Sequence, residues 1–331
     1  MQLLVLSAAD VRALLSYDEC AAAMRGALTA LAAGRAQQPL RTIIAPDGAA
    51  GLMALMPSYL HGDGGPDAAY ALKAICITPS NPAAGLDTHQ GVVVLSSGRT
   101  GEPLALLNAS AVTEIRTAAV SVVATDVLAR PDADELAIIG TGVQARAHLL
   151  ALDGARQLSE IRVAGRDADR AEQFAASLIG QTRAPVLACA SARNAAAGAG
   201  IIVTATSSAR PVLHRDWIER GAHINAVGAC LPNQRELDTA TVGAAVLFAD
   251  RRDSLLAESG DYRLAAAEGA VTEGHIRAEL GELLLGTATG RASADEITIF
   301  ESLGLAIEDL AAASRVYRLA TDTSAGTWTE F

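Results

Sequence analysis

From residue 134 onward, short apolar runs alternate with helical segments, and this alternation constrains the fold more than any other feature. The runs that predict strands lie at 136–139, 161–164, 186–189, 201–205, 224–227 and 246–249. Runs that are apolar on both faces are typical of parallel strands covered by helices on two sides. We therefore predict an α/β fold in which this half of the chain forms a Rossmann-type parallel sheet.

A glycine-rich turn joins the first of these strands to a helix predicted over 144–152. The turn reads Gly-Thr-Gly-Val-Gln-Ala over residues 140–145. The first glycine permits a tight turn, the second lets the backbone approach a pyrophosphate, and the small alanine keeps helix and strand close. The helix N-terminus adds unsatisfied N–H groups and a partial positive charge. The turn thus predicts a nicotinamide dinucleotide site formed by Gly140, Thr141, Gly142, Val143 and Gln144.

The end of the second strand bears on the choice between NADP(H) and NAD(H). An acidic residue there binds a ribose 2′-hydroxyl, whereas an arginine accommodates a 2′-phosphate. This chain has Gly165 at the strand end, followed by Arg166 and Asp167. Asp167 is interpreted as the cap of the helix predicted over 168–179. We therefore favour NADP(H) over NAD(H), with Arg166 as the phosphate ligand.

The first part of the chain has a different pattern. After helices predicted near 8–15 and 17–34, strands separated by turn residues are predicted at 40–45, 51–56, 69–78, 91–96 and 103–108. This succession is typical of an antiparallel sheet. Further helices are predicted over 111–128, 274–285 and 304–320, and one more strand over 297–300. We predict a smaller α+β domain for substrate binding and dimerisation, formed by residues 1–118 with 305–331, and a dinucleotide-binding domain over 119–304.

Composition limits the possible partners. The net charge is −11 with no run of basic residues, which argues against nucleic acid. No apolar run approaches the roughly 20 residues needed to span a bilayer, and the first ten residues lack the basic region of a signal peptide. The four cysteines have no C-x-x-C spacing, which indicates buried thiols in a reducing compartment. We expect a cytoplasmic protein with no metal site.

The chain contains a single lysine, Lys73, among 26 basic residues. It lies in a strand-like apolar stretch, where a charge is costly without a partner. An edge-strand lysine facing solvent is one interpretation. The other is that the site requires a compact ammonium whose pKa burial can shift. Two more isolated cations, Arg41 and Arg116, lie in apolar segments of the same domain, and together the three suggest a carboxylate pocket.

The sequence resembles the ornithine cyclodeaminase/mu-crystallin family over nearly its whole length. The stretches that carry the resemblance are Gln38–Thr42, Leu55–Pro57, Thr88–Gln90, Ile115–Ala119, Ile139–Gln144, Ala222–Gly228, Arg235–Leu237 and Ser302–Gly304. The resemblance implies a homodimer in which the first domains pair their sheets. It implies that Arg41, Lys73 and Arg116 hold the substrate carboxylate and reacting centre. It also places Thr206, Val227 and Ser302 near the cofactor.

Two departures from the family pattern bear on the reaction. The resemblance implies that cyclodeaminases carry a glutamate where this chain has Ala54, and an aspartate where it has Cys230. Without these carboxylates a distal substrate amine has no partner, so we expect imine reduction and not cyclisation. The expected substrate is a cyclic imino acid such as Δ1-pyrroline-2-carboxylate or Δ1-piperideine-2-carboxylate. Lys73 is the first candidate for the proton donor and His89 the second, although His89 can equally be a hydrogen-bonded structural residue.

Three alternatives remain open from the sequence. An amino-acid dehydrogenase of the alanine type would oxidise a small amino acid with NAD⁺. An ornithine cyclodeaminase would form proline from ornithine without net cofactor turnover. A protein of another class would bind NADPH or a ligand without catalysis.

Overall fold

The chain divides into two compact units. The first contains Met1–Arg116 and Gly304–Phe331, and the second contains Thr117–Leu303. In the computed structural model, the described residues are 2–62 and 68–331. Each unit is built around its own sheet.

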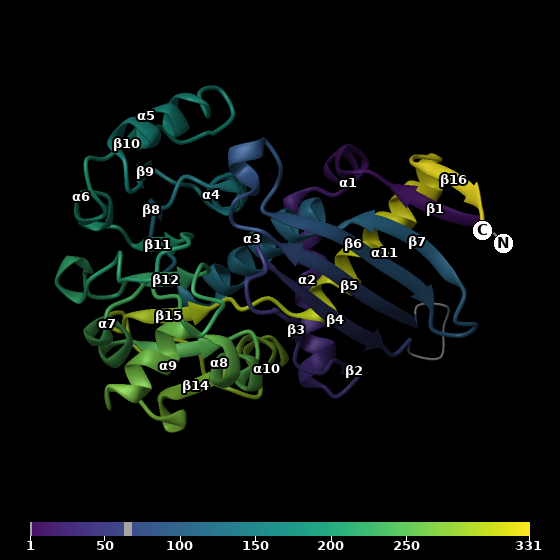
Figure 1. Cartoon of the computed structure of the whole chain (residues 1–331). Coiled ribbons are helices and arrows are strands. Elements are labelled where there is room, and N and C mark those ends of the chain that lie inside the picture. The colour runs from purple at the N-terminus through teal and green to yellow at the C-terminus, as the bar shows by residue number, and fades with distance from the viewer. Residues whose placement is uncertain (1, 63–67) are drawn as a thin grey trace. The chain divides into compact units, whose positions relative to one another are not determined.

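The sheet of the first unit is mostly antiparallel (Figure 1). Its strands follow the order β16-β1-β7-β6-β5-β4-β2, with β3 paired to β4. The only parallel pair in this sheet, among the described residues, is β1 with β7. The strands are β1 (Gln2–Leu6), β2 (Ala36–Gln37), β3 (Thr42–Ile44), β4 (Leu52–Leu60), β5 (Ala69–Ile77), β6 (His89–Ser97), β7 (Pro103–Asn108) and β16 (Thr327–Glu330).

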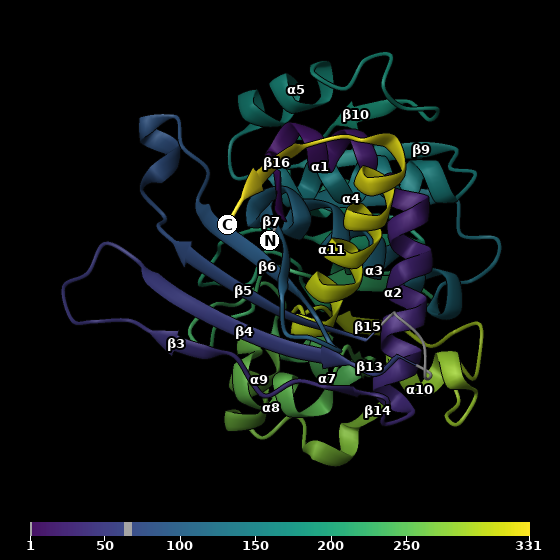
Figure 2. The same cartoon turned by 90° about the vertical axis from the view of Figure 1, so that its right-hand side faces the viewer.

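Helices cover one face of this sheet (Figure 2). Helix α11 packs against the central strands β4, β5 and β6 and against helix α2. The helices of the unit are α1 (Ala8–Leu14), α2 (Tyr17–Ala32), the 3-10 helix η1 (Asn81–Ala84), α11 (Ala306–Thr323) and the first part of α3 (Ala109–Leu128).

Strand β5 shows how the two faces of this sheet differ. Successive side chains of a strand point to opposite faces. Ala71, Lys73 and Ile75 are buried, whereas Tyr70 and Leu72 are exposed. Lys73 therefore lies on the face that the helices cover, in the middle of a central strand.

The sheet of the second unit is parallel throughout the described residues. Its order is β10-β9-β8-β11-β12-β15-β13-β14. Figure 1 shows α4 and α6 on opposite sides of β8 and β9. The strands are β8 (Glu135–Ile139), β9 (Glu160–Ala164), β10 (Val186–Ala188), β11 (Ile201–Thr204), β12 (His223–Ala226), β13 (Val246–Ala249), β14 (Ile276–Glu279) and β15 (Thr298–Glu301).

The helices of the second unit join these strands or follow them. They are α4 (Val143–Ala155), α5 (Ala168–Ala176), α6 (Ala192–Ala196), α7 (Thr239–Ala244), α8 (Arg252–Glu258), α9 (Gly260–Ala267) and α10 (Leu280–Leu285), with 3-10 helices η2 (Arg215–Trp217) and η3 (Glu273–His275). The predicted α/β class with a Rossmann-type parallel sheet is confirmed.

The helix predicted over 274–285 is wrong in its first half. Residues Ile276–Glu279 form β14, which pairs with β13 at the end of the sheet. Ile276 and Ala278 are buried while Arg277 is exposed, which is the two-residue period of a strand. A helix begins only at Leu280.

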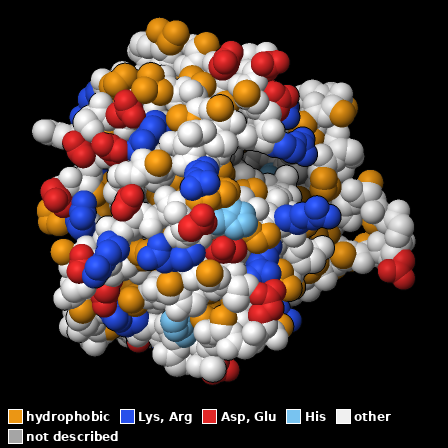
Figure 3. Space-filling model, turned by 90° about the vertical axis from the view of Figure 1, so that its left-hand side faces the viewer, with side chains coloured by type: hydrophobic (Ala, Val, Ile, Leu, Met, Phe, Trp, Pro, Cys, Tyr) orange, Lys and Arg blue, Asp and Glu red, His pale blue; other side chains and the backbone are white. Residues whose placement is uncertain are grey.

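The surface mixes charges of both signs. On the face drawn in Figure 3, basic and acidic side chains are interspersed. Among the described residues, no helix is both long and apolar enough to span a membrane.

Candidate active site

The glycine turn of the second unit has the backbone geometry that its sequence demands. Gly140 follows β8 with φ of +135°, and a Cβ there would overlap the carbonyl oxygen of Ala205. Gly142 is the N-cap of α4, and no atom lies within 4 Å of the position that its Cβ would take. The first glycine is thus required by backbone conformation and packing. The second leaves open space at a helix N-terminus, where a pyrophosphate fits.

The other predicted cofactor residues lie at the same edge of the parallel sheet. Each follows the carboxyl end of a strand: Gly140 after β8, Arg166 after β9, Thr206 after β11, Val227 after β12 and Ser302 after β15. Strands β9 and β10 lie on one side of β8, while β11 and β12 lie on the other. The strand order therefore reverses between β8 and β11. Such a switch point is where open α/β sheets bind ligands.

After β9, Asp167 caps the following helix, as the sequence predicts. The Asp167 Oδ1 accepts a hydrogen bond of 3.0 Å from the backbone N–H of Asp169, so Asp167 is the N-cap of α5. Arg166 is exposed. The carboxylate after β9 is thus engaged in a helix cap, and the residue before it in the sequence is an exposed arginine.

Sequence reasoning missed Glu236, a fully buried residue that connects two loops of this edge. Its Oε1 accepts a 2.6 Å hydrogen bond from the backbone N–H of Thr206, and its Oε2 accepts one of 2.7 Å from Gly228. Glu236 therefore holds together the loops that follow β11 and β12. The only sequence signal was its place in the stretch Arg235–Leu237, which carries no hint of these partners.

Further carboxylates are buried behind Glu236. Asp261 Oδ1 accepts 2.8 Å hydrogen bonds from the backbone N–H groups of Glu236 and Leu237. Burial, and next the charge of Glu236, raise the pKa of Asp261 to about 7. Burial also raises the pKa of Glu301 well above its usual value, with the charge of Asp261 adding to the effect.

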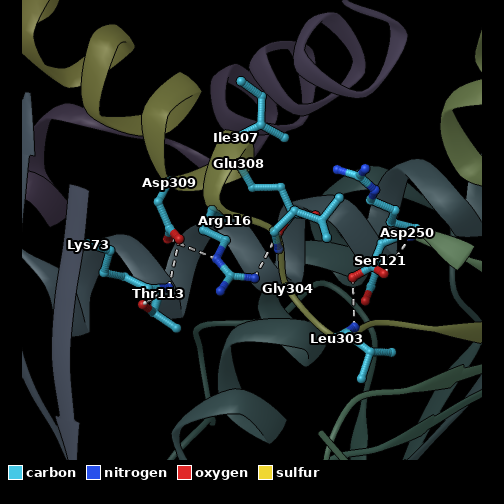
Figure 4. Close-up of polar contacts among 12 residues, drawn as sticks. Lys73, Thr113, Arg116, Ser121, Asp250, Leu303, Gly304, Ile307, Glu308 and Asp309 are labelled. Atoms are coloured by element: carbon cyan, nitrogen blue, oxygen red, sulfur yellow. Dashed lines mark hydrogen bonds and ion pairs between the residues drawn. The ribbon is translucent and has the colours of Figure 1, made fainter. Parts of the chain in front are cut away.

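In the first unit, the structure brings Lys73 and Arg116 together around two carboxylates of α11 (Figure 4). The Lys73 Nζ lies 2.7 Å from Asp309 Oδ2. Arg116 Nε lies 3.2 Å from the other oxygen of Asp309, and Arg116 Nη1 lies 2.8 Å from Glu308 Oε2. All four side chains are at most 5% exposed. We call Lys73, Arg116, Glu308 and Asp309 the buried ion cluster.

Arg41 joins this group through the backbone. Its Nη2 donates a 2.9 Å hydrogen bond to the carbonyl oxygen of Gly304. Gly304 itself adjoins Arg116, because a Cβ on Gly304 would lie 2.6 Å from Arg116 Nη1. All three predicted substrate cations are therefore connected within one unit.

The structure shows that two of these cations are paired, and it excludes one of the two interpretations of Lys73. Lys73 and Arg116 are not isolated charges, because each forms an ion pair. Lys73 is also not an edge-strand residue facing solvent, since β5 lies between β4 and β6 and Lys73 is 2% exposed. The acidic partners were missed because Glu308 and Asp309 begin a helix, where acids are usual. The signal that could have found them is two adjacent acids inside an otherwise apolar run.

The two candidate proton donors, Lys73 and His89, differ in their protonation near neutral pH. Burial lowers the pKa of Lys73 to about 8, although the charge of Asp309 opposes that effect. His89 begins β6, and burial lowers its pKa below the usual range, with the charges of Lys73 and Arg116 adding to the shift. Near neutral pH, Lys73 is therefore mostly protonated and His89 is mostly neutral. Among the described residues, no hydrogen bond involves the His89 ring. The interpretation of His89 as a hydrogen-bonded structural residue therefore has no support in this part of the chain.

The sequence of the chain is similar to those of known proteins. The profile of the ornithine cyclodeaminase/mu-crystallin family matches residues 1–324. The chain belongs to that family. It is 37% identical to a Δ(1)-pyrroline-2-carboxylate reductase of Bacillus cereus over 330 residues, which are 99% of this chain and 100% of the relative. It is 37% identical to the ketimine reductase mu-crystallin of Mus musculus over 86% of this chain and 85% of the relative.

Solved structures of similar proteins share the fold. The Thermococcus litoralis Δ(1)-pyrroline-2-carboxylate reductase, in complex with NADH and L-proline, matches with a TM-score of 0.93 and 38% identity, over 98% of this chain and 99% of that one. An archaeal alanine dehydrogenase dimer with bound NAD matches with a TM-score of 0.93 and 32% identity over the whole of both chains. The family resemblance seen in the sequence is confirmed.

Within the family, the two departures noted in the sequence can now be located. Ala54 is buried on β4, where it pairs with Ile75 and so shares the helix-covered face with Lys73. A side chain at this position thus faces the same side of the sheet as the ammonium. Cys230 is half-buried, and its Sγ lies 3.8 Å from the carbonyl oxygen of Gly228, which it contacts as a weak donor. Neither position supplies a carboxylate.

Proposed function

We propose that this enzyme reduces cyclic imino acids that carry a carboxylate on the imine carbon, with Δ1-pyrroline-2-carboxylate and Δ1-piperideine-2-carboxylate as the expected substrates. The observation that carries the proposal is the buried ammonium of Lys73 beside two guanidinium groups. Such a set can bind a carboxylate and protonate a nitrogen. The Δ(1)-pyrroline-2-carboxylate reductases and the ketimine reductase among the relatives support the same substrate class.

The charges of the buried ion cluster, together with Arg41, favour an anionic substrate. Lys73, Arg41 and Arg116 are three cations, while Glu308 and Asp309 are two carboxylates, which leaves a net charge of +1 when all are ionised. Arg41 and Arg116 would bind the substrate carboxylate. Lys73 would then hold a proton close to the imine nitrogen.

The reaction needs one hydride and one proton. The glycine turn and the N-terminus of α4 would hold a nicotinamide dinucleotide, which would supply the hydride when bound. As the C=N π pair moves to nitrogen, the Lys73 ammonium donates a proton to that nitrogen, and the ring becomes a secondary amine. Lys73 is reprotonated from solvent afterwards. Its pKa of about 8 lets it both donate and regain a proton near neutral pH.

The cofactor site supports NADP(H) as the preferred nucleotide. Gly142, with open space at its Cβ position, and the N-terminus of α4 would hold the pyrophosphate. Thr141, Val143 and Gln144 complete this turn. Arg166 would bind a 2′-phosphate, since the nearby Asp167 carboxylate is used as a helix cap. Thr206, Val227 and Ser302 would line the nicotinamide half.

We also propose that the enzyme is a cytoplasmic homodimer formed through the sheet of the first unit. On the face opposite the helices, Met53, Tyr70, Leu72 and Val92 are 37–50% exposed. An apolar sheet face of this kind is typical of a protein interface. The related archaeal alanine dehydrogenase is a dimer. Light scattering at micromolar concentration should give twice the chain mass, and the mass of a single chain would contradict the proposal.

A second candidate function is amino-acid dehydrogenation of the alanine type. The 32% identity to the archaeal alanine dehydrogenase favours it. Cyclodeamination has less support, because Ala54 and Cys230 provide no carboxylate for a distal amine. A ligand-binding role without catalysis does not explain why a proton-donating ammonium is buried at the site.

A panel of spectrophotometric assays separates these functions. NADPH and NADH are each mixed with the two cyclic imines, and with pyruvate plus ammonia. NAD⁺ is mixed with L-alanine and with L-ornithine. Oxidation of NADPH by a cyclic imine at a rate well above the other pairs is expected. Proline formed from ornithine without net change in NAD⁺ would indicate a cyclodeaminase, and NADPH binding without turnover would indicate a carrier.

A further inference from the structure

The two carboxylates of the buried ion cluster occupy different places although they are adjacent in sequence. Asp309 contacts both cations, with Oδ2 at 2.7 Å from Lys73 Nζ and Oδ1 at 3.2 Å from Arg116 Nε. Glu308 contacts Arg116 at 2.8 Å and also accepts a 3.1 Å hydrogen bond from the backbone N–H of Leu305, which caps α11. Asp309 therefore bridges the two cations, whereas Glu308 serves one cation and the helix cap (Figure 4).

We infer that Asp309 is a positioning residue, whose carboxylate holds the Lys73 ammonium and the Arg116 guanidinium in one fixed arrangement for the imine and its carboxylate. This inference deepens the proposed function and rests on it. Lys73 is on β5 and Arg116 is on α3, so neither element alone fixes the distance between the two cations. Asp309 lies near the N-terminus of α11, which packs on β5, and it supplies that link.

The surroundings of Lys73 show why the link matters. Thr113 Oγ1, on α3, lies 3.5 Å from Lys73 Nζ, which is a long contact. Two cations on other elements, Arg116 and Arg41, disfavour the ammonium, whereas the α11 carboxylates Asp309 and Glu308 favour it. His89 on β6 lies within electrostatic reach and is mostly neutral near pH 7. Asp309 is thus the carboxylate in direct contact with Lys73 and the one that most favours its charged form.

An asparagine at 309 would keep the shape and lose the charge. The buried ammonium would then face two guanidinium groups without its carboxylate, and its pKa would fall by about one unit or more. Glu308→Gln is the matched control, because it removes an equally buried carboxylate of the same helix turn that pairs with Arg116 and not with Lys73. Its effect on Lys73 should be smaller.

The single lysine of the chain makes this measurable without an activity assay. Protein labelled with ¹³C-lysine gives one side-chain Cε signal, which reports the protonation of Lys73 as the pH is varied. The full chain with NADP⁺ added is titrated as wild type, Asp309→Asn and Glu308→Gln. We expect a midpoint near 8 for wild type, a clearly lower midpoint for Asp309→Asn, and a smaller change for Glu308→Gln. The basic limb of the pH–rate profile for imine reduction should follow the same midpoints.

The inference is overturned if Asp309→Asn leaves the midpoint unchanged, or if Glu308→Gln shifts it by as much. If Asp309→Asn does not fold, the Asp309→Glu variant tests the positioning role instead. It keeps the charge and moves it by one methylene, so the midpoint should stay near 8 while kcat falls at least about tenfold. Full kcat in Asp309→Glu would then overturn the positioning role. A wild type that reduces no cyclic imine refutes the proposed function, whereas the Cε titration still decides the role of Asp309.

Discussion

Gly304 and Arg116 lie so close that a side chain at position 304 would displace the Arg116 guanidinium. A Cβ on Gly304 would lie 2.6 Å from Arg116 Nη1, and the Gly304 φ of +82° is in the left-handed region. The carbonyl oxygen of Gly304 also accepts the Arg41 hydrogen bond. This glycine therefore adjoins both guanidinium groups that are proposed to bind the substrate carboxylate.

Gly304→Ala should displace Arg116 and lower kcat/KM for a cyclic imino acid by roughly ten- to a hundredfold, since small misplacements of binding groups are costly. The left-handed backbone alone should cost about 1 kcal/mol of unfolding free energy. Gly34→Ala is the matched control, because Gly34 has φ of +72° and no atom within 4 Å of its Cβ position. Equal kinetic losses in the two variants would contradict the account.

The two glycines of the dinucleotide turn should respond differently to alanine. Gly140→Ala should lower both the melting temperature and NADPH affinity, because its Cβ would overlap Ala205 and its φ is +135°. Gly142→Ala should lower stability by only about 0.5–1 kcal/mol, because alanine is a poorer N-cap than glycine but its Cβ position is open. It should still weaken NADPH binding about tenfold or more, because the methyl group occupies the pyrophosphate space. Fluorescence titration with NADPH and thermal unfolding together test this. If Gly142→Ala binds NADPH with unchanged affinity, the pyrophosphate does not bind at Gly142.

Asp261 should make the fold less stable as the pH rises. Its pKa is raised to about 7 in the folded protein, from 3.8 for an ordinary aspartate. Between these values the folded state keeps a proton that the unfolded state has lost, so stability falls as pH rises from about 4 to about 7 and does not fall further for this reason above 7. Glu301 acts in the same direction.

Asp261→Asn keeps the oxygen that accepts from Glu236 and Leu237 and removes the charge. The difference in melting temperature between pH 5 and pH 8 should therefore be smaller in this variant than in wild type. Asp322→Asn, an exposed position on α11, serves as the control and should behave as wild type. A pH dependence unchanged by Asp261→Asn would show that Asp261 is ionised in the folded state throughout this range.

Arg166→Ala tests the assignment of the 2′-phosphate. The Michaelis constant for NADPH should rise about tenfold, which is typical of losing one charge-assisted contact, while that for NADH should not change. Arg170→Ala is the control, since Arg170 is another exposed arginine on the following helix α5. A wild type that prefers NADH would contradict the assignment directly.

The sequence predicted local features well and long-range pairings poorly. The glycine turn was predictable because a positive φ and a close strand–helix junction demand glycine within a few residues. Lys73 could be singled out from composition, because it is the single lysine of the chain. Its partner could not be predicted, because Asp309 lies more than 200 residues further along the chain and reads as an ordinary acid at a helix start.

The same limit explains the other errors. Glu236 bonds to the backbone of Thr206 and Gly228, and a backbone N–H leaves no trace in the sequence. The strand at Ile276–Glu279 is four residues long, and its alternation is too short to outweigh the apolar run that follows.

The central claim is that the Lys73 ammonium takes part in the reduction of a cyclic imine. Its most direct test is the steady-state oxidation of NADPH with Δ1-pyrroline-2-carboxylate by wild type and Lys73→Ala, with NADPH affinity measured in parallel. We predict that wild type turns over and that Lys73→Ala loses more than about tenfold in kcat, as expected for a general acid, while it binds NADPH with unchanged affinity. A Lys73→Ala variant that is as active as wild type would contradict the claim.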